Sequence, residues 1–461
     1  MLKLNIKIAT LVAALALVGC EKDMEITPFA SKPKAQIVVD ENDVRSLVNG
    51  GYEALSSSNC YGARWLMNAE LYGADPAELR WRGTFADPRQ FYNKFILTTN
   101  ADASSMWTHG YNLINNMNHA IESMALVKDE ALRNQLEGEA KLLRAIAHFE
   151  LLRFYGKAFL EGAANNEVNS GVPLMLKSDD IGKVSRATVA EVYAAIEKDM
   201  TEAESKLPER SGVVANSRSV FADKSIAAAF LSRVYLQQYK YAQARDAANR
   251  VIASNNYGLM VEPEFAYNSA AVTREDVFVV ASTAQDNVNS MYAFFGLGRN
   301  GDVEYLAGLL NQFPTGDKRR ILFRPNPANG RVISRKWNEA NNSNVNIIRL
   351  AEMYLTRAEA NFALNETKGA TPLEDINLIR VRAGLTPLTA LTITDIRRER
   401  KLELIAEGHL IHDLKRWKLS VRGRNASNAL ITMPYDSPAL VAPIPQRDIN
   451  VNPNLKQNAG Y

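Results

Sequence analysis

The segment from residue 394 to 419, TDIRRERKLELIAEGHLIHDLKRWKL, constrains the fold of this chain most strongly. Apolar residues recur along it at steps of four, four, four and three, the spacing of one helical face. These residues are Leu402, Ala406, Leu410, Leu414 and Trp417. Leu404 and Ile411 mark a second apolar side, so the pattern predicts one helix packed on two faces. Gly408 falls in mid-helix, which indicates a close backbone approach there.

The same segment carries a row of carboxylates, Glu399, Glu403 and Glu407, at every fourth position. Like charges at this spacing repel, so they need cationic partners from elsewhere in the fold. We expect these partners to be Arg349 and Arg357, in a predicted helix over 347–364. General acid–base catalysis is the alternative role for such a row, but a helix packed on two faces favours a structural network. The predicted members of that network are Arg349, Glu399, Arg400, Glu403 and Glu407.

Length and charge set broad limits. With 461 residues, 46% of them hydrophobic, the chain can bury the core of one large domain or of two ordinary ones. Its 54 Lys and Arg residues nearly balance 51 Asp and Glu residues. This balance gives no electrostatic reason to expect a nucleic-acid partner.

The N-terminus has the pattern of an export signal. Lys3 and Lys7 precede a short apolar run that ends in the sequence LVGC at Cys20, which predicts a signal peptide over 1–19. The LVGC sequence resembles a bacterial lipobox, in which the cysteine is lipidated. Residues 20–40 then read as a lipidated tether. Cys60 is left without a partner, so we expect it to be a small buried hydrophobic side chain.

Helical periodicity dominates the remainder and predicts an all-α fold built from helical pairs. A first helix over 41–57 would be capped by Asp40 or Asn42. Small and aromatic residues alternate in several later helices, as in tetratricopeptide repeats. The regularity breaks over 73–106 and 258–343, where a strand is expected only at 277–281. The predicted later helices cover 104–126, 130–156, 188–206, 222–238, 241–254, 347–364, 372–382 and 394–417.

Several of these segments carry a family resemblance. ERKLELIAEGHLIHDLKRWK resembles the late signature helix of the SusD/RagB family of outer-membrane lipoproteins, with Leu410 where the family has Arg. Further blocks at 138–156, 171–174, 349–360, 377–384 and 443–461 resemble other family motifs in the same order. The resemblance implies a SusD-like domain over 41–461, with tetratricopeptide-like helical pairs and long irregular excursions.

The resemblance also implies a function. Members of this family are non-catalytic nutrient-binding lipoproteins of the cell outer membrane that work with a SusC-like TonB-dependent transporter. By resemblance, this chain would be anchored through Cys20, exposed at the cell surface, and would deliver oligosaccharides for import. No cofactor is implied. Peptide capture by the same complex is the first alternative.

The ligand face is expected in the two irregular segments, which are rich in aromatic and planar polar side chains. Sugars present apolar C–H faces and hydroxyl groups, which flat rings and planar hydrogen-bonding groups recognise. The wider set includes Phe85, Tyr92, Phe294 and Tyr305, with Arg82, Asn289 and Asp302 beside them. The residues that we predict to bind ligand are Arg80, Trp81, Tyr292, Trp337 and Asn338.

Other functional patterns are weaker. A GxGxxG string at 296–301 lacks the surrounding strand and helix of a dinucleotide site, so a loop is expected. His409 and His412 stand one helical turn apart, yet we predict no metal site, because packing and ion pairs account for that segment. A secreted glycosidase would need a pair of acids in a cleft, and none stands out. A plain tetratricopeptide adaptor would not need a lipid anchor.

Overall fold

The computed structural model describes residues 38–160, 162–178, 184–209, 220–298, 301–337, 343–424, 427 and 429–461. The predicted signal peptide, Cys20 and most of the predicted tether lie outside these residues. The first described helix, α2 (Glu41–Ser56), begins at a capping box in which Asp40 accepts from the backbone of Asp43. The N-cap is therefore Asp40, which is one of the two residues predicted for that position.

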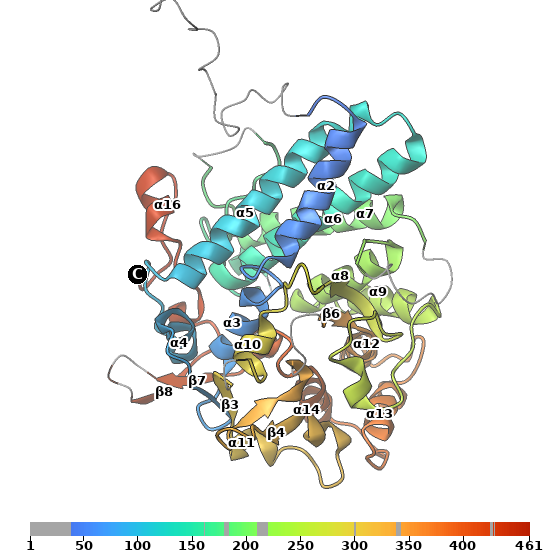
Figure 1. Cartoon of the computed structure of the whole chain (residues 1–461), viewed down its shortest axis with the longest axis vertical. Coiled ribbons are helices and arrows are strands. Elements are labelled where there is room, and N and C mark those ends of the chain that lie inside the picture. Colours follow the sequence, from blue (N-terminus) through green and yellow to red (C-terminus); the bar gives the residue numbers. More distant parts are fainter. Residues whose placement is uncertain are drawn as a thin grey trace, which may run out of the picture.

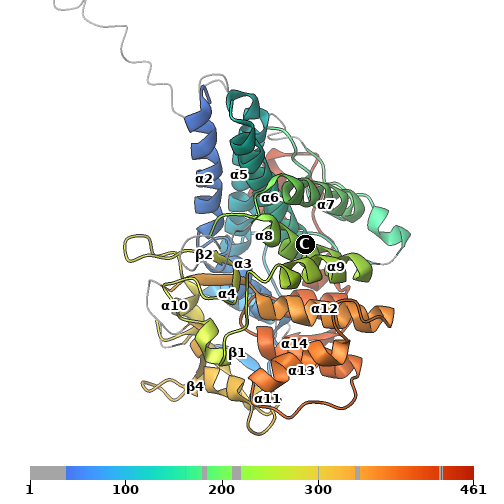
Figure 2. The same cartoon turned by 90° about the vertical axis from the view of Figure 1, so that its right-hand side faces the viewer.

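The scaffold is a stack of helices that pack largely in chain order (Figures 1 and 2). Each of α5 to α9 contacts the next, and α2 lies against α5. After α9 the chain leaves the stack and returns as α12, which packs against α9. This confirms the predicted all-α fold of helical pairs. The scaffold helices are α5 (Ala101–Glu122), α6 (Glu130–Tyr155), α7 (Val189–Lys206), α8 (Lys224–Gln237), α9 (Tyr241–Ala253), α12 (Leu350–Leu364), α13 (Pro372–Arg382) and α14 (Ile393–Leu404).

The predicted single helix over 394–417 is wrong, because the chain forms two helices there. Helix α14 ends at Leu404, and α15 (Leu410–Arg416) begins after a five-residue break. Ala406 and Gly408 have φ of 70° and 82° in this break, a left-handed conformation that a helix cannot contain. Gly408 therefore serves a turn, and the close backbone approach predicted there is also present, because a Cβ on Gly408 would come within 2.9 Å of the Leu66 Cα atom. A Cβ at Gly408 would also come within 2.8 Å of Leu66 Cδ2.

Short antiparallel strand pairs lie in and around the irregular segments, and one of them, β1 with β3, joins the two segments. In the described residues they form two-stranded sheets, and the predicted strand at 277–281 is present one residue earlier, as β2. The pairs are β1 (Leu79–Trp81) with β3 (Val303–Tyr305), β2 (Asp276–Val280) with β6 (Val345–Arg349), β4 (Phe323–Pro325) with β5 (Val332–Ser334), and β7 (Val421–Arg424) with β8 (Leu430–Met433).

Shorter helices complete the excursions and the C-terminal region. Helix α3 packs against both α4 and α15, which ties the first excursion to the end of the scaffold. These helices are α3 (Arg64–Gly73), α4 (Ala86–Asn93), α10 (Met291–Phe295), α11 (Ala307–Leu310) and α16 (Gln446–Val451), with 3-10 turns at Met124–Leu126, Ala163–Asn166, Pro263–Ala266, Lys318–Leu322, Arg335–Trp337 and Pro438–Leu440.

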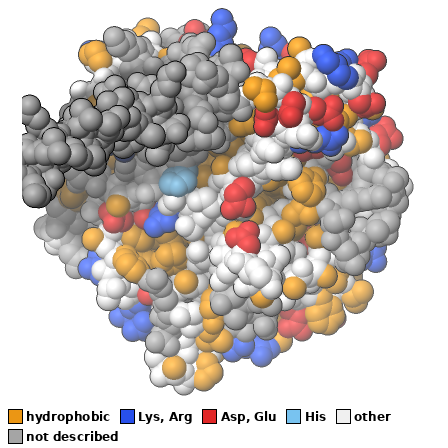
Figure 3. Space-filling model, turned by 45° about the horizontal axis from the view of Figure 1, so that its top comes forward, with side chains coloured by type: hydrophobic (Ala, Val, Ile, Leu, Met, Phe, Trp, Pro, Cys, Tyr) orange, Lys and Arg blue, Asp and Glu red, His pale blue; other side chains and the backbone are white. Residues whose placement is uncertain are grey.

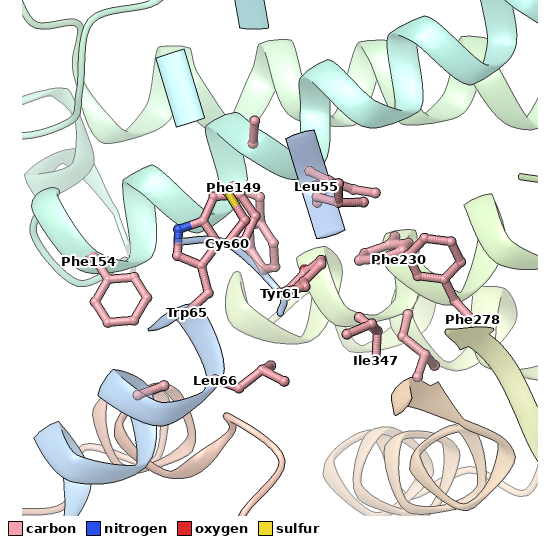
Figure 4. Packing of buried hydrophobic residues seen from close by; sticks show 14 of the residues in the cluster. Leu55, Cys60, Tyr61, Trp65, Leu66, Phe149, Phe154, Phe230, Phe278 and Ile347 are labelled. Atoms are coloured by element: carbon pink, nitrogen blue, oxygen red, sulfur yellow. The ribbon is translucent and has the colours of Figure 1, made fainter. Parts of the chain in front are cut away.

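One large hydrophobic core runs through the helical stack and beneath the excursions. Figure 4 shows a part of this core, where side chains from helices and a strand far apart in sequence pack together, such as Phe149 of α6, Phe230 of α8 and Phe278 of β2. Cys60 lies among them, fully buried and without a disulfide, as predicted. Burial raises the pKa of its thiol far above the usual value, which keeps the thiol protonated.

Candidate functional site

Strands β1 and β3 bring the two irregular segments together. Their antiparallel register places Arg80 opposite Glu304 and Trp81 opposite Val303. The backbone N–H of Arg82 extends the ladder by donating to the Asp302 carbonyl at 2.6 Å. Residues more than 200 positions apart in sequence therefore share one small surface.

Helix α10 adds the ring of Phe294 to this surface and carries Tyr292 two residues earlier. The ring centroids of Trp81 and Phe294 lie 6.3 Å apart at 34°. Tyr292 is half-buried, and its ring lies against Gly298, where a Cβ would come within 2.7 Å. We call this group the aromatic site. Its members are Arg80, Trp81, Arg82, Tyr292, Phe294 and Glu304.

Arg82 and Glu304 form an ion pair at the edge of the aromatic site, and both side-chain groups are planar. Arg82 Nε donates to Glu304 Oε2 at 2.7 Å, and Arg80 Nη1 lies 4.0 Å from the same oxygen. The Arg80 side chain is 47% exposed. Guanidinium and carboxylate groups in this arrangement keep free donors and acceptors for hydroxyl groups. Glu304 was missed in the sequence, because only the strand register places it here.

Trp81 is more deeply set than we expected. It is 7% exposed, and its indole Nε1 has no hydrogen-bond partner among the described residues. Gly83 explains part of this burial, since a Cβ there would lie 2.4 Å from the indole ring. Trp81 therefore supports the site from below, and the more accessible rings are those of Tyr292, Phe294 and the nearby Phe85, which is 45% exposed.

The structure corrects the position of Trp337. This residue is 1% exposed, and its Nε1 donates to the Ala406 carbonyl at 2.9 Å. Its ring face is covered by the core, so it cannot stack on a ligand in this structure. Asn338 lies outside the described residues. From the wider aromatic set, Tyr92 and Tyr305 are also buried.

Arg349 is the centre of a buried charge cluster. Its guanidinium donates to Glu407 at 2.8 and 2.9 Å, to Glu275 at 2.6 Å and to Glu403 at 3.1 Å. Arg382 bridges Glu275 and Glu403, and Lys336 donates to Glu407 at 2.6 Å. All of these side chains are buried. The row of carboxylates is thus matched by cations, even though Glu407 lies beyond the end of α14.

Glu399 extends this cluster through Arg319 and Arg380, at 2.8 and 2.5 Å. Arg319 also pairs with Asp317. We call the whole group the charge cluster. It contains as many cationic as acidic side chains, which are Glu275, Asp317, Arg319, Lys336, Arg349, Arg380, Arg382, Glu399, Glu403 and Glu407.

One predicted partner of the row, Arg357, and one predicted member of the network, Arg400, are placed differently. Arg357 is not a partner of the row, because it pairs with Asp375 at 2.7 Å on the next helix. Arg400 points to another group and pairs with Asp413 at 2.8 Å. Asp413 also accepts from Arg416, which pairs in turn with Glu359.

Electrostatics favours ionised carboxylates in the charge cluster. Burial by itself would raise the pKa of Glu403, but Arg382, Arg349 and Arg319 outweigh burial and hold its pKa well below the usual range. The pKa of Glu407 is lowered in the same way, against burial, by Arg349 and Lys336. A carboxylate held ionised and enclosed by cations is a poor general acid, which favours the predicted structural role of the cluster.

The break between α14 and α15 wraps around another buried carboxylate, Glu70. One oxygen accepts from the backbone N–H groups of Gly408 and His409 at 2.9 and 3.0 Å, with Leu410 at 3.4 Å; the other accepts from Ala406 at 3.1 Å. Left-handed residues commonly turn successive N–H groups towards an anion in this way. Burial raises the pKa of Glu70 to about 7, and these four donors oppose the rise.

The structure also shows where the two histidines and the GxGxxG string lie. His409 and His412 are both buried, and the His412 ring packs edge-on against Phe154. Within the described ranges, no group of three metal-binding side chains occurs. The described residues of the GxGxxG string, 296–298 and 301, lie between the short helix α10 and β3 and are not helical, and residues 299 and 300 lie outside the described residues.

Two further features concern the distribution of side chains on the outer surface and the hydropathy of the helices. On the face seen in Figure 3, acidic and basic side chains are interspersed, and hydrophobic side chains form separate patches. Among the helices described, none is long and apolar enough to cross a membrane.

The fold and site define a helical-repeat scaffold that carries an aromatic surface, and related proteins share this scaffold. A model of the SusD family matches residues 329–461, and a model described as starch-binding associating with outer membrane matches residues 40–236. The chain is 26% identical to SusD-like protein P2 of Formosa agariphila over 99% of both chains. The chain belongs to the SusD/RagB family.

Two further similarities are informative. The chain is 34% identical to the starch-binding protein SusD of Bacteroides thetaiotaomicron over 127 residues, which cover 26% of this chain and 22% of that protein. A solved SusD superfamily protein from the same species superposes with a TM-score of 0.79 at 24% identity, covering 91% of this chain and all of that one. This structural similarity supports the fold.

Proposed function

We propose that this protein is a non-catalytic, surface-exposed lipoprotein that binds oligosaccharides at the aromatic site. The observation that carries the proposal is the convergence of Trp81 and Phe294 with the ion pair of Arg82 and Glu304, beside which the short helix α10 also carries Tyr292. Rings that stack on apolar sugar faces beside groups that bond hydroxyls are the chemistry of glycan recognition. The match to a starch-binding family model supports this ligand class.

The burial and pairing of the acidic side chains support a binding role over a catalytic one. Glu399, Glu403 and Glu407 are enclosed by cations and are at most 5% exposed. Hydrolysis of a glycosidic bond would need two acids that face a substrate with different protonation states. The alternative ligand is a peptide, which could use the same rings.

The test is calorimetric titration of the protein with matched panels of neutral oligosaccharides and peptides. We expect a glycan to bind with a Kd in the micromolar to millimolar range, because a delivered ligand must be released quickly. Tyr292→Ala should weaken binding about tenfold, as expected for the loss of one ring contact. Phe265→Ala removes a ring that is 53% exposed elsewhere and is the matched control. Binding of peptides alone would reject the ligand class.

We further propose that lipidation of Cys20 anchors the protein to the outer membrane, where it assembles with a SusC-like TonB-dependent transporter. The lipobox-like sequence at Cys20 and the family membership support this arrangement. Labelled palmitate should be incorporated by the natural protein and lost in Cys20→Ala. Mild-detergent purification should recover a TonB-dependent barrel protein with the natural chain. Retained label in the variant, or recovery of the lipoprotein alone, would contradict these two parts separately.

A further inference from the structure

A cavity of about 200 Å³ lies away from the aromatic site, where α15 meets the C-terminal segment whose end is marked C in Figure 1. The chain that follows α6 and the loop that follows β8 form its other walls. The polar residues that line it are Lys157, Glu167, Lys415, Tyr435, Asp436 and Asn458. Such a volume accommodates a molecule of about monosaccharide size.

Lys415 is the unusual member of this lining. It is 6% exposed, yet its ammonium has neither a salt bridge nor a hydrogen bond to any part of the chain that the structure describes. The Lys415 Nζ atom makes a cation–π contact with Tyr72, 5.8 Å from the centroid of its ring. A buried ammonium without a counter-ion is costly.

Two other buried lysines show what ordinarily offsets this cost. Lys94 donates to the carbonyls of Leu71, Ala74 and Tyr92 at 3.2, 2.6 and 2.7 Å. Lys336 is paired with Glu407. Lys415 has no such acceptors, and it lines a cavity. Lys415 Nζ has no acceptor in the described residues, and it is not one of the polar atoms that are fully shielded from solvent. Its acceptor is therefore water or a ligand in the cavity.

The charges around Lys415 do not supply the missing anion. Burial and the nearby Arg153 lower the pKa of Lys415 to about 7. Arg153 is already paired with Glu150. At the cavity wall, Lys157 pairs with Glu167 at 2.6 Å. The titratable or charged groups that face Lys415 from the surrounding elements are Tyr72, Arg153, Lys157, Glu167, His412, Tyr435 and Asp436.

The walls also limit the charge of a ligand. Since Lys415 is the unmatched cation, it can balance one negative charge. The exposed carboxylate of Asp436 would repel a second negative charge but can accept hydrogen bonds from hydroxyl groups. The half-buried Tyr435 adds a ring and a phenol beside it. A single carboxylate on a hydroxylated body therefore matches the cavity better than phosphate does.

We propose that this cavity is a second ligand site, which binds a small hydroxylated carboxylate such as an acidic monosaccharide, with the carboxylate on Lys415 Nζ. The proposal does not depend on the aromatic site, because the cavity, the residues and the ligand charge are different. The carboxylate of the ligand would accept hydrogen bonds from Lys415 Nζ, which has no acceptor among the described residues.

Calorimetric titration with glucuronate, glucose, acetate and inorganic phosphate tests this site. We expect glucuronate to bind more tightly than the other three. Lys415→Met keeps the side-chain stem and removes the charge, and it should weaken glucuronate binding by at least about tenfold. Lys401→Met, in which a partly exposed lysine loses its pair with Glu78, is the matched control and should bind as the natural protein does.

Proton uptake provides a second measurement that needs no variant. With a pKa of about 7, Lys415 is mainly a neutral amine at pH 8 in the free protein, and a bound carboxylate favours its ammonium form, so binding at pH 8 should take up close to one proton. At pH 5.5 the uptake should vanish. Equal glucose and glucuronate affinities, no glucuronate binding at millimolar concentrations, unchanged binding by a folded Lys415→Met, or no proton uptake at pH 8 would each overturn the proposal. Acetate or phosphate binding as tightly as glucuronate would overturn the ligand class.

Discussion

The charge cluster and the aromatic site use charged groups in opposite ways. In the charge cluster, Arg349 contacts three carboxylates, and every charge is buried and matched. In the aromatic site, Arg80 is 47% exposed and 4.0 Å from Glu304. Buried pairs fix one geometry because each partner is costly to leave alone, whereas exposed pairs contribute little and leave donors for a ligand. The comparison separates a scaffold from the surface that we propose binds the ligand.

The largest effect should come from removing Glu403. Glu403→Ala leaves Arg382 and Arg349 buried with fewer acceptors, and we expect it to lower the free energy of unfolding by roughly 3–5 kcal/mol. Urea denaturation of the variant and the natural protein measures this directly. Glu41→Ala breaks an exposed pair with Arg45 and should cost less than about 0.5 kcal/mol. Equal effects of the two changes would show that burial does not distinguish the two regions.

Acid should remove the contribution of the charge cluster to the stability of the fold. The folded pKa values of Glu403 and Glu407 are depressed, so their contribution to stability is present above the unfolded value of about 4.3 and is lost as pH falls through the folded values. We expect the melting temperature to fall steadily below pH 5. In Glu403→Gln this fall should be shallower, and identical pH profiles for the two proteins would contradict the assignment.

A glycine substitution in the break between α14 and α15, compared with one in helix α2, tests the conformation of that break. Gly408→Ala forces a left-handed residue to carry a Cβ close to Leu66, and should cost roughly 1–3 kcal/mol. Gly50→Ala lies in α2 with nothing within 4 Å of the new Cβ, and should stabilise the protein by about 0.5–1 kcal/mol. Thermal unfolding of both variants measures the contrast. A stabilising Gly408→Ala would support the continuous helix that the sequence predicted.

The smallest effect concerns the indole N–H of Trp81. Trp81→Phe keeps a ring against Phe294 and removes an N–H that has no partner among the described residues. We expect stability to change by less than about 1 kcal/mol, because no hydrogen bond is lost within the protein. Glycan affinity measured by calorimetry should fall only a few-fold. If affinity falls as far as in Tyr292→Ala, then Trp81 contacts the ligand directly.

Sequence patterns predicted the scaffold well, because its helices have strong local signals. Asp40 caps α2, apolar residues recur at helical spacing, and the acidic row called for Arg349. The break at Gly408 was missed, because the residues on either side of it kept an apolar spacing that also fits a continuous helix. The carboxylate of Glu70, which the break encloses, lies more than 300 residues earlier.

The aromatic site could be predicted only in part. Composition located the two irregular segments, but it could not separate the half-buried Tyr292 from the buried Trp337, since both lie outside regular helical stripes. Burial there depends on contacts such as that of Trp337 with the Ala406 carbonyl. Glu304 enters through the register of β1 and β3, which a single sequence does not specify.

The most direct test measures stability and glycan affinity together in Tyr292→Ala and Glu403→Gln. The two regions are separate in function if each variant loses one property alone. We predict that Tyr292→Ala binds glycan about tenfold more weakly and stays within about 1 kcal/mol of the natural stability, since the residue is only half-buried. Glu403→Gln should unfold more easily and bind with unchanged affinity below its melting temperature. Normal binding by Tyr292→Ala, or lost binding by folded Glu403→Gln, would contradict this account.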